Sequence, residues 1–147
     1  MQELSYPEDG KPTLPLPVDF SISHSGVLIA CALVTKGRVG LDVEMLRPMD
    51  VQVFRRMFTD AERAHAGSDP RKFFDLWSSK EAVIKAWGQG GVWDMSKVSL
   101  RKSGATLAGT HWQLLALDID PAYSAHVAMD RKSPAATLHS VELDISS

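Results

Sequence analysis

The middle of the chain carries a segment whose apolar residues recur at helical spacing. Asp69 followed by Pro70 is typical of a helix start and Gly88 of a helix end, which predicts a helix over residues 70–87. The apolar stripe of this helix has spacings of three and four residues and comprises Phe73, Phe74, Trp77, Ile84 and Trp87. One face of the helix is therefore expected to be buried.

Apolar or alternating segments on both sides of this helix predict strands. Residues 28–34 form an apolar run, Lys36 and Gly37 supply a turn, and residues 39–44 return, so a β-hairpin is expected. Further strands are expected at 98–100, 112–117 and 123–129, and short helices at 51–57 and 60–65. The expected fold class is α+β, an antiparallel sheet packed against a long helix.

The chain is expected to form one globular domain with two flanking segments. Its 147 residues, 44% of them apolar, suffice for one core, assigned to residues 20–130. Residues 1–19 contain several prolines, which predicts an extended lead-in. Residues 131–147 are expected to form a C-terminal tail, or an edge strand at 139–145.

Two acids share one face of the strand expected at 39–44. Side chains alternate along a strand, so Asp42 and Glu44 lie on the same side as Gly40. Two neighbouring carboxylates repel each other unless a cation lies between them. The simpler alternative is that this face is solvated and the acids have no special role.

A third acid lies inside the apolar stripe of the long helix. Glu81 follows Trp77 by four residues, so it projects among the aromatic side chains, and Lys80 borders the same stripe. A carboxylate in an apolar surrounding needs a cation or a metal, because an isolated buried charge costs several kcal/mol. An intrahelical pair with Lys85 is the alternative, but it does not explain why Glu81 lies on the stripe.

Three carboxylates from a strand and a helix are typical of a magnesium site, and manganese is also a possible occupant. Magnesium prefers oxygen ligands and commonly shares its shell with substrate phosphates, which Lys80 and Lys85 would then face. A zinc site is not indicated, since the chain has one Cys and its five His residues show no ligand spacing. Cys31 lies in an apolar run and is expected to be a core residue.

Composition excludes several classes of protein. A net charge of −2 and a pI near 6.2 argue against nucleic acid or a membrane surface as the main partner. No apolar stretch reaches the roughly 18 residues of a membrane span, and the first residues do not resemble a secretory signal. A cytoplasmic location is expected.

The motifs resemble those of the 4′-phosphopantetheinyl transferase superfamily, in particular its surfactin-type branch. The principal matches are Gly40, Asp42 and Glu44, followed by Trp77, Ser78, Lys80, Glu81, Ala82 and Lys85. Further matches, in the expected order, are Gly10-Lys11-Pro12, residues 20–25, Gly88 and Gly90. The resemblance spans about residues 10–90, and Ser21 departs from it by standing where the family often has Asn.

The resemblance implies a reaction and a role for each matched residue. It implies transfer of 4′-phosphopantetheine from coenzyme A to a serine of an acyl or peptidyl carrier protein, the holo-acyl-carrier-protein synthase reaction, releasing adenosine 3′,5′-bisphosphate. Magnesium would be held by Asp42, Glu44 and Glu81, and phosphate charge would be neutralised by Lys80 and Lys85. The nucleotide would be bound by Lys11, Ser23 and His24, although a surface His24 without a role is the alternative.

Catalysis by these residues would require a base and an electrostatic clamp. Attack of a serine hydroxyl on a phosphoryl group needs its proton removed and the charge on the phosphate oxygens offset. Glu81 is the candidate base, directly or through water, and Lys85 offsets charge. Near the expected short helix, Phe54, Met57 and Phe58 could be core or a carrier-docking surface, and the helical spacing favours core.

The chain is shorter than the members of the family that it resembles. The resemblance implies two similar halves in one polypeptide, and this chain is expected to hold the second half with only the end of the first. The other half could be a separate partner chain, or self-association into a homo-oligomer could replace it. Alternatively the protein is a non-catalytic module that binds coenzyme A or a carrier protein; a phosphohydrolase using the same acids is a more distant alternative.

Overall fold

The computed structural model of the chain describes residue 5 and residues 10–102 and 104–130. The strand expected at 139–145 therefore lies outside the described residues. The strands are β1 (Asp19–Ser25), β2 (Leu28–Val34), β3 (Val39–Met45), β4 (Ser99–Arg101), β5 (Gly104–Leu107), β6 (Thr110–Ala116) and β7 (Tyr123–Met129). The helices are α1 (Asp60–Ala66) and α2 (Pro70–Trp87), with 3-10 turns η1 (Val51–Phe54) and η2 (Val92–Lys97).

The strands form two antiparallel sheets. One sheet has five strands in the order β3-β7-β6-β5-β4, and the other is the two-stranded pair β1-β2. The hairpin expected between residues 28–34 and 39–44 was wrong, because β2 pairs with β1 and β3 pairs with β7. β1 and β2 are joined by only Gly26 and Val27, with Gly26 at a φ of 57°, so this tight turn determines the pairing.

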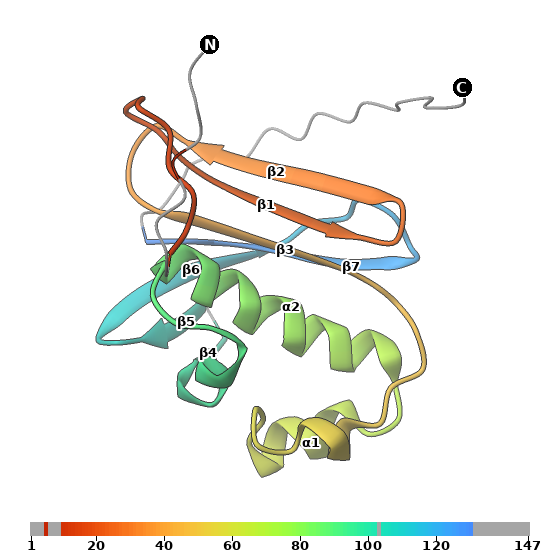
Figure 1. Cartoon of the computed structure of the whole chain (residues 1–147). Coiled ribbons are helices and arrows are strands. Elements are labelled where there is room, and N and C mark those ends of the chain that lie inside the picture. Colours follow the sequence, from red (N-terminus) through yellow and green to blue (C-terminus); the bar gives the residue numbers. More distant parts are fainter. Residues whose placement is uncertain (1–4, 6–9, 103, 131–147) are drawn as a thin grey trace, which may run out of the picture.

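Helix α2 packs across β3 and β7, as Figure 1 shows, and has the bounds that the sequence predicts. The Asp69 side chain caps its N-terminus by accepting from the backbone N–H of Arg71, and Gly88 ends it in a left-handed conformation at a φ of 75°. Gly40 allows the close approach of the helix, because a Cβ there would lie 1.9 Å from the carbonyl oxygen of Ala82.

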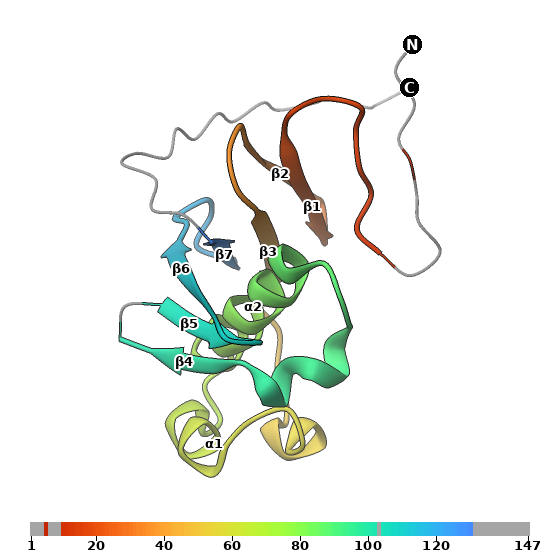
Figure 2. The ribbon, with the colours of Figure 1, turned by 90° about the vertical axis from the view of Figure 1, so that its left-hand side faces the viewer.

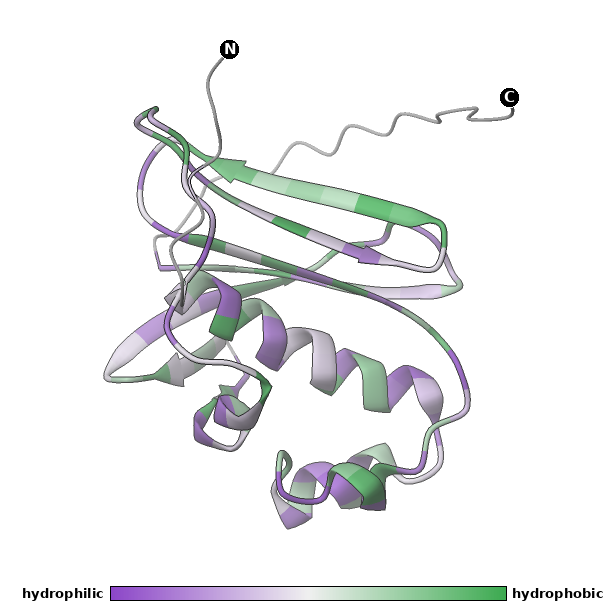
Figure 3. Cartoon of the chain, viewed as in Figure 1, coloured by the Kyte–Doolittle hydropathy of each residue, from purple (hydrophilic) through white to green (hydrophobic). Residues whose placement is uncertain are grey.

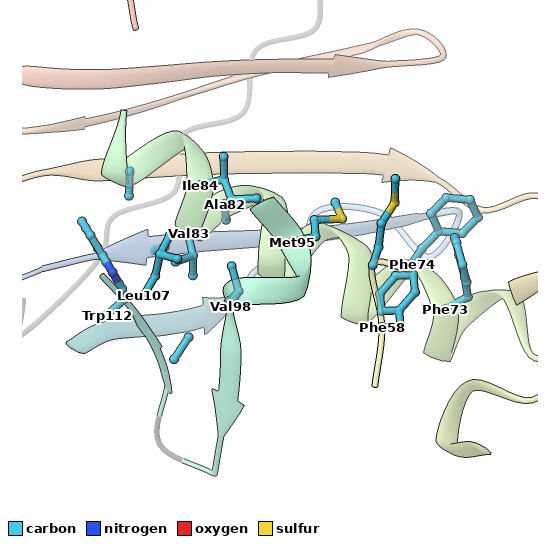
Figure 4. Close-up of a cluster of buried hydrophobic side chains, with 14 of the residues drawn as sticks. Phe58, Phe73, Phe74, Ala82, Val83, Ile84, Met95, Val98, Leu107 and Trp112 are labelled. Carbon is cyan, nitrogen blue, oxygen red and sulfur yellow. The ribbon is translucent and has the colours of Figure 1, made fainter. Parts of the chain in front are cut away.

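The main core lies between α2, the sheet and η2 (Figure 4). Its largest fully buried apolar side chains include Trp112, Phe73, Phe74 and Met95. Trp77 packs edge-on against Phe54, which continues the aromatic cluster toward η1. Met57 and Phe58 are buried, so the interpretation of these residues as core is confirmed. 

The opposite face of β3 and β7 is covered by the β1-β2 hairpin (Figure 2). The inward side chains of β2 pack there, namely Leu28, Ala30, Ala32 and Val34. The outward ones are exposed, with Ile29 at 76% and Leu33 at 58% of their full area, and Figure 3 shows how apolar this strand is. Cys31 is one of these outward residues, so its expected core position was wrong: a continuous apolar run hid the alternation of the strand.

Strand β1 is attached to β3 by side chains instead of a backbone ladder. The backbone N–H groups of alternate β3 residues donate to side-chain oxygens of β1 at distances of 2.7–3.1 Å. The pairs are Val39 with Asp19, Leu41 with Ser21, Val43 with Ser23, and Met45 with Ser25. Both strands advance in the same direction through this series, so β1 runs parallel to β3. We call these contacts the side-chain ladder.

The predicted α+β fold, an antiparallel sheet packed against a long helix, is therefore confirmed, and the β1-β2 hairpin covers the other face of that sheet. Within the part of the chain that the structure describes, no helix combines the length and the apolar character needed to cross a membrane.

Candidate functional site

The acids and cations singled out by the sequence meet where β1, β3 and α2 come together. They line a hollow of about 450 Å³ that we call the acidic hollow. Its lining includes six sequence-predicted residues, namely Ser23, His24, Asp42, Glu44, Glu81 and Lys85. Trp77 and Val92 close its apolar side. Lys11 and Lys80, the other two residues expected to bind substrate, do not line this hollow.

Asp42 is the most buried acid of the site, with 4% of its area exposed. Its Oδ1 atom accepts from the ammonium of Lys85 at 2.8 Å and from the hydroxyl of Ser23 at 3.2 Å. Burial raises the pKa of this carboxyl to about 7 against the opposing effect of Lys85, and the charges of Glu44 and Glu81 raise it further. Desolvation thus outweighs the ion pair.

Glu81 and Glu44 approach Asp42 from α2 and β3. Glu81 is half-buried, and burial raises its pKa, with Lys85 opposing and Glu44 adding to the shift. Glu44 is also half-buried, and its Oε2 atom lies 3.4 Å from the guanidinium of Arg47. The pKa values of Asp42 and Glu81 are thus both raised, mainly by burial and further by the charge of Glu44, as expected of acids gathered around a place for a cation.

Lys85 connects the long helix to β3. Its ammonium donates to Asp42 Oδ1 at 2.8 Å, to the carbonyl of Leu41 at 3.1 Å and to Ser23 Oγ at 3.2 Å. Among the ion pairs of the described residues, none joins Lys85 to Glu81, so the intrahelical alternative is not the one adopted. One positive charge is thus held among three acids.

The donor chemistry of the acidic hollow fits a hard divalent cation. The Asp42 Oδ2 atom is buried and has no hydrogen-bond partner, and carboxylate oxygens are the ligands that magnesium and manganese prefer. However, within the described residues no three His, Cys, Asp or Glu side chains are arranged so that they could hold a metal as they stand. The acids share one hollow, and side-chain rotation of Glu44 or Glu81 would be needed to complete a ligand set.

A second hollow of about 530 Å³ adjoins the first and shares Ile22, Glu81 and Lys85 with it. Its other walls include the Gly10-Lys11-Pro12 segment, the glycines that follow α2, and the side chains of Phe20, Ser21 and Ile84. We call it the glycine-lined hollow. Glycines leave backbone N–H groups accessible to a ligand, which suits a phosphate-bearing molecule.

Lys11 lines the glycine-lined hollow, but its head group is already engaged. The ammonium lies 2.5 Å from both Asp19 Oδ2 and the carbonyl oxygen of Val39. Burial lowers its pKa, and the contact with Asp19 opposes that shift. Asp19 was not identified from the sequence, because a lone Asp before an apolar residue carries no distinguishing pattern. These two contacts use two of the three protons of the ammonium, so Lys11 can donate a third hydrogen bond to an anion.

Lys80 does not line either hollow, so its position does not support the expected contact with phosphate. Its side chain is completely buried and donates to Glu62 Oε2 at 2.7 Å. It also donates to the carbonyls of Met57 at 3.1 Å and Met95 at 3.3 Å. All three protons of the ammonium have acceptors, which makes Lys80 a clamp between α2, α1 and η2.

Ser23 and His24 differ in their availability to a ligand. Ser23 is buried at 5% exposure, and its hydroxyl contacts Val43, Asp42 and Lys85, so the expected contact with nucleotide is not supported by its position. His24 is exposed and lines the acidic hollow, where it can reach an anion.

His126 was missed by the sequence analysis. It lies opposite Asp42 in the β3-β7 register, and its Nδ1 atom is 2.7 Å from the hydroxyl of Ser78. Burial lowers the pKa of this imidazole, with Asp75 opposing. A histidine among apolar residues of 123–129 was the available signal, but the sequence does not show which strand lies beside it.

Comparison with known proteins identifies the family. A family model described as "4'-phosphopantetheinyl transferase superfamily" matches residues 38–136. This match covers β3 and α2, the two elements that carry the three acids and Lys85.

Curated relatives agree with this match. A 4'-phosphopantetheinyl transferase of Bacillus subtilis is 36% identical over 101 residues, covering 64% of this chain and 45% of the relative. The 4'-phosphopantetheinyl transferase psf-1 of Bacillus pumilus is 34% identical over 145 residues, covering 89% of this chain and 61% of the relative. The 4'-phosphopantetheinyl transferase AcpT of Salmonella typhi is 35% identical over 107 residues, covering 67% of this chain and 55% of the relative. The chain thus spans about half the length of the curated relatives it matches.

Proposed function

Because the chain belongs to the 4'-phosphopantetheinyl transferase superfamily, we propose that it transfers 4′-phosphopantetheine from coenzyme A to a serine of an acyl or peptidyl carrier protein. The observation that supports this most strongly is the gathering of Asp42, Glu81 and Lys85 in the acidic hollow, beside the glycine-lined hollow. The acidic hollow supplies the cation Lys85 and the candidate base Glu81. The glycine-lined hollow has room for a phosphate-bearing nucleotide.

A divalent cation would be held by Asp42, Glu44 and Glu81, with the unpartnered Asp42 Oδ2 as its most buried ligand. Bound magnesium, or manganese in its place, supplies positive charge that offsets charge on the phosphate oxygens. The oxygen-only donor set supports this choice of metal.

Glu81 would accept the proton of the attacking serine. It is half-buried on a rigid helix, and its raised pKa makes it a stronger base than an exposed glutamate. The serine oxygen forms a bond to phosphorus as the bond from that phosphorus to the oxygen of adenosine 3′,5′-bisphosphate breaks. Lys85 lines both hollows and would offset charge on the leaving group.

The glycine-lined hollow is the proposed site for the nucleotide part of coenzyme A. Its backbone walls at Gly10, Gly88 and Gly90 can approach phosphate closely, and Lys11 adds a cation at its edge. His24 lies on the rim of the neighbouring acidic hollow, where it would contact an anionic group. Coenzyme A and carrier proteins are available in the cytoplasm, the proposed location.

The assembly that performs this reaction is also a proposal. The chain spans about half the length of its relatives, and we propose that a second copy of this chain or a separate partner chain contributes to the site. The outward face of the β1-β2 hairpin, with Ile29 and Leu33 exposed, is apolar enough to contact such a partner.

A non-catalytic module that binds coenzyme A or a carrier protein is the second candidate. Specific contacts favour it: Lys85 is paired with Asp42, and Lys11 with Asp19, so two cations expected to bind phosphate have protein partners. Catalysis would require the pair of Lys85 and Asp42 to yield to substrate and metal.

Mass spectrometry of the carrier protein separates these candidates. The chain would be incubated with coenzyme A, magnesium and an unmodified carrier protein, alone and with a candidate partner chain. A gain of the phosphopantetheine mass, lost in Glu81→Gln but retained in the control Asp60→Asn on exposed α1, supports the transferase. Binding of carrier or coenzyme A without a mass gain supports the non-catalytic module.

A further inference from the structure

Three serines of β1 occupy equivalent places in the side-chain ladder. Ser21, Ser23 and Ser25 each accept a hydrogen bond from a backbone N–H of β3, at 3.0, 3.1 and 2.9 Å respectively. Ser21 and Ser23 are also equally buried, at 5% exposure. If the serines served only to attach β1 to β3, Ser21 and Ser23 would be interchangeable in their effects.

Ser23 alone among these serines has charged partners. Its hydroxyl lies 3.2 Å from Asp42 Oδ1 and 3.2 Å from the ammonium of Lys85. A hydroxyl has one proton and can accept two hydrogen bonds. The N–H of Val43 and the ammonium of Lys85 can only donate, so the single proton of Ser23 must go to Asp42. The hydroxyl is then fully satisfied.

This arrangement determines which oxygen of Asp42 is available. Oδ1 accepts hydrogen bonds from Ser23 and Lys85, whereas Oδ2 is buried without a hydrogen-bond partner. A carboxylate is planar, so two donors on Oδ1 restrict the rotation of the group and thereby the direction of Oδ2. Side chains that orient a ligand in this way commonly control metal affinity.

We propose that Ser23 is a positioning residue that holds Asp42 so that Oδ2 is presented to a divalent cation, and that Ser23 itself binds no phosphate. This rests on the proposed metal site of the transferase. It assigns to Ser23 a role different from the nucleotide contact implied by the family resemblance.

Manganese binding by Ser23→Ala and the matched control Ser21→Ala tests the inference. Free Mn²⁺ would be followed by electron paramagnetic resonance during titration of each purified chain. Both variants lose one ladder bond, and Ser23→Ala also loses its contacts with Asp42 and Lys85, so its urea midpoint should fall at least as far as that of Ser21→Ala. Ser23→Ala should bind Mn²⁺ about 10- to 100-fold more weakly than wild type, the usual effect of removing a group that orients a ligand, and Ser21→Ala should match wild type.

A second measurement separates positioning from phosphate binding. Affinity for adenosine 3′,5′-bisphosphate in EDTA should be the same for Ser23→Ala and wild type, because the Ser23 hydroxyl is saturated by protein groups. If Ser23→Ala does not fold, Ser23→Cys keeps the size with a poor donor and should show the weakened Mn²⁺ binding. Ser23→Thr retains the hydroxyl and should restore binding.

The outcomes distinguish this inference from the proposed function. Equal Mn²⁺ affinities in Ser23→Ala and Ser21→Ala, with normal binding by wild type, would overturn the positioning role and leave the metal site standing. A selective loss of nucleotide affinity in EDTA would likewise overturn it. If wild type binds no Mn²⁺, the proposed metal site and the positioning role both fail.

Discussion

The ammonium of Lys85 lies 2.8 Å from Oδ1 of Asp42, joining the last turn of α2 to strand β3. The carboxylate side chain is 6% exposed and the lysine side chain 31%, so the pair is only partly screened by water. This contact holds a positive charge beside Glu81 and fixes the position of α2 over β3.

Lys85→Met should lower the free energy of unfolding by about 2 kcal/mol, because it leaves Asp42 buried without its counter-charge. The double variant Lys85→Met/Asp42→Asn should recover part of that loss, since no unpaired charge remains. Urea unfolding of the wild type, both single variants and the double variant gives the coupling directly. Strictly additive losses would contradict an energetic link between the two residues.

Lys80→Met should destabilise the protein by about 3–5 kcal/mol, because Glu62 and two backbone carbonyls lose their buried donor. Lys97→Met is the matched control, since Lys97 is exposed and pairs with Asp94 on the surface, and it should unfold like wild type. At a temperature where Lys80→Met remains folded, its affinity for coenzyme A should be unchanged. A selective loss of that affinity would restore Lys80 as a phosphate contact.

Gly40→Ala should be among the most damaging small substitutions, costing about 3 kcal/mol or more. The added Cβ would meet backbone atoms of α2, at 1.9 Å from the oxygen of Ala82 and 2.4 Å from the nitrogen of Ala86. Gly91→Ala is the control, because nothing lies within 4 Å of its Cβ position and its φ of −148° suits any residue. Thermal melting compares the two, and equal melting temperatures would contradict the close packing of α2 on β3.

The raised pKa of Asp42 predicts how stability changes with pH in EDTA. The native carboxyl holds its proton up to about pH 7, whereas the unfolded chain releases it near pH 4, so the native state binds more protons between these values. Stability contributed by Asp42 should therefore fall as pH rises from about 4 to about 7. Urea unfolding across this range should show wild type losing stability relative to Asp42→Asn; a relative gain would mean that Lys85 outweighs burial.

Local signals in the sequence were sufficient for the long helix and for the face shared by Asp42 and Glu44. Pro70 and Gly88 act through their own backbone geometry and Asp69 through its side-chain cap, and strand alternation alone brings the two acids to one side. The gathering of Glu81 and Lys85 beside them followed from the motif, because α2 and β3 adjoin through Gly40.

The sequence did not show which strands pair, or which side chains meet, when they lie far apart along the chain. An apolar run such as 28–34 can pair with either neighbour, and the short turn at Gly26 decided for β1. The apolar stripe of α2 places Lys80 at its edge. Only the tertiary structure shows that Glu62 of α1 is the partner of Lys80. Likewise, a serine repeat in 19–25 gives no sign of the ladder to β3.

The most direct test of the central claim is a magnesium titration of the isotopically labelled protein followed by nuclear magnetic resonance. One saturable transition is expected, with the largest backbone shifts at Asp42, Glu44 and Glu81, and it should disappear in Asp42→Asn. Shifts that do not saturate, or that centre on surface acids such as Asp60 and Asp94, would show that the three carboxylates do not form a common cation site.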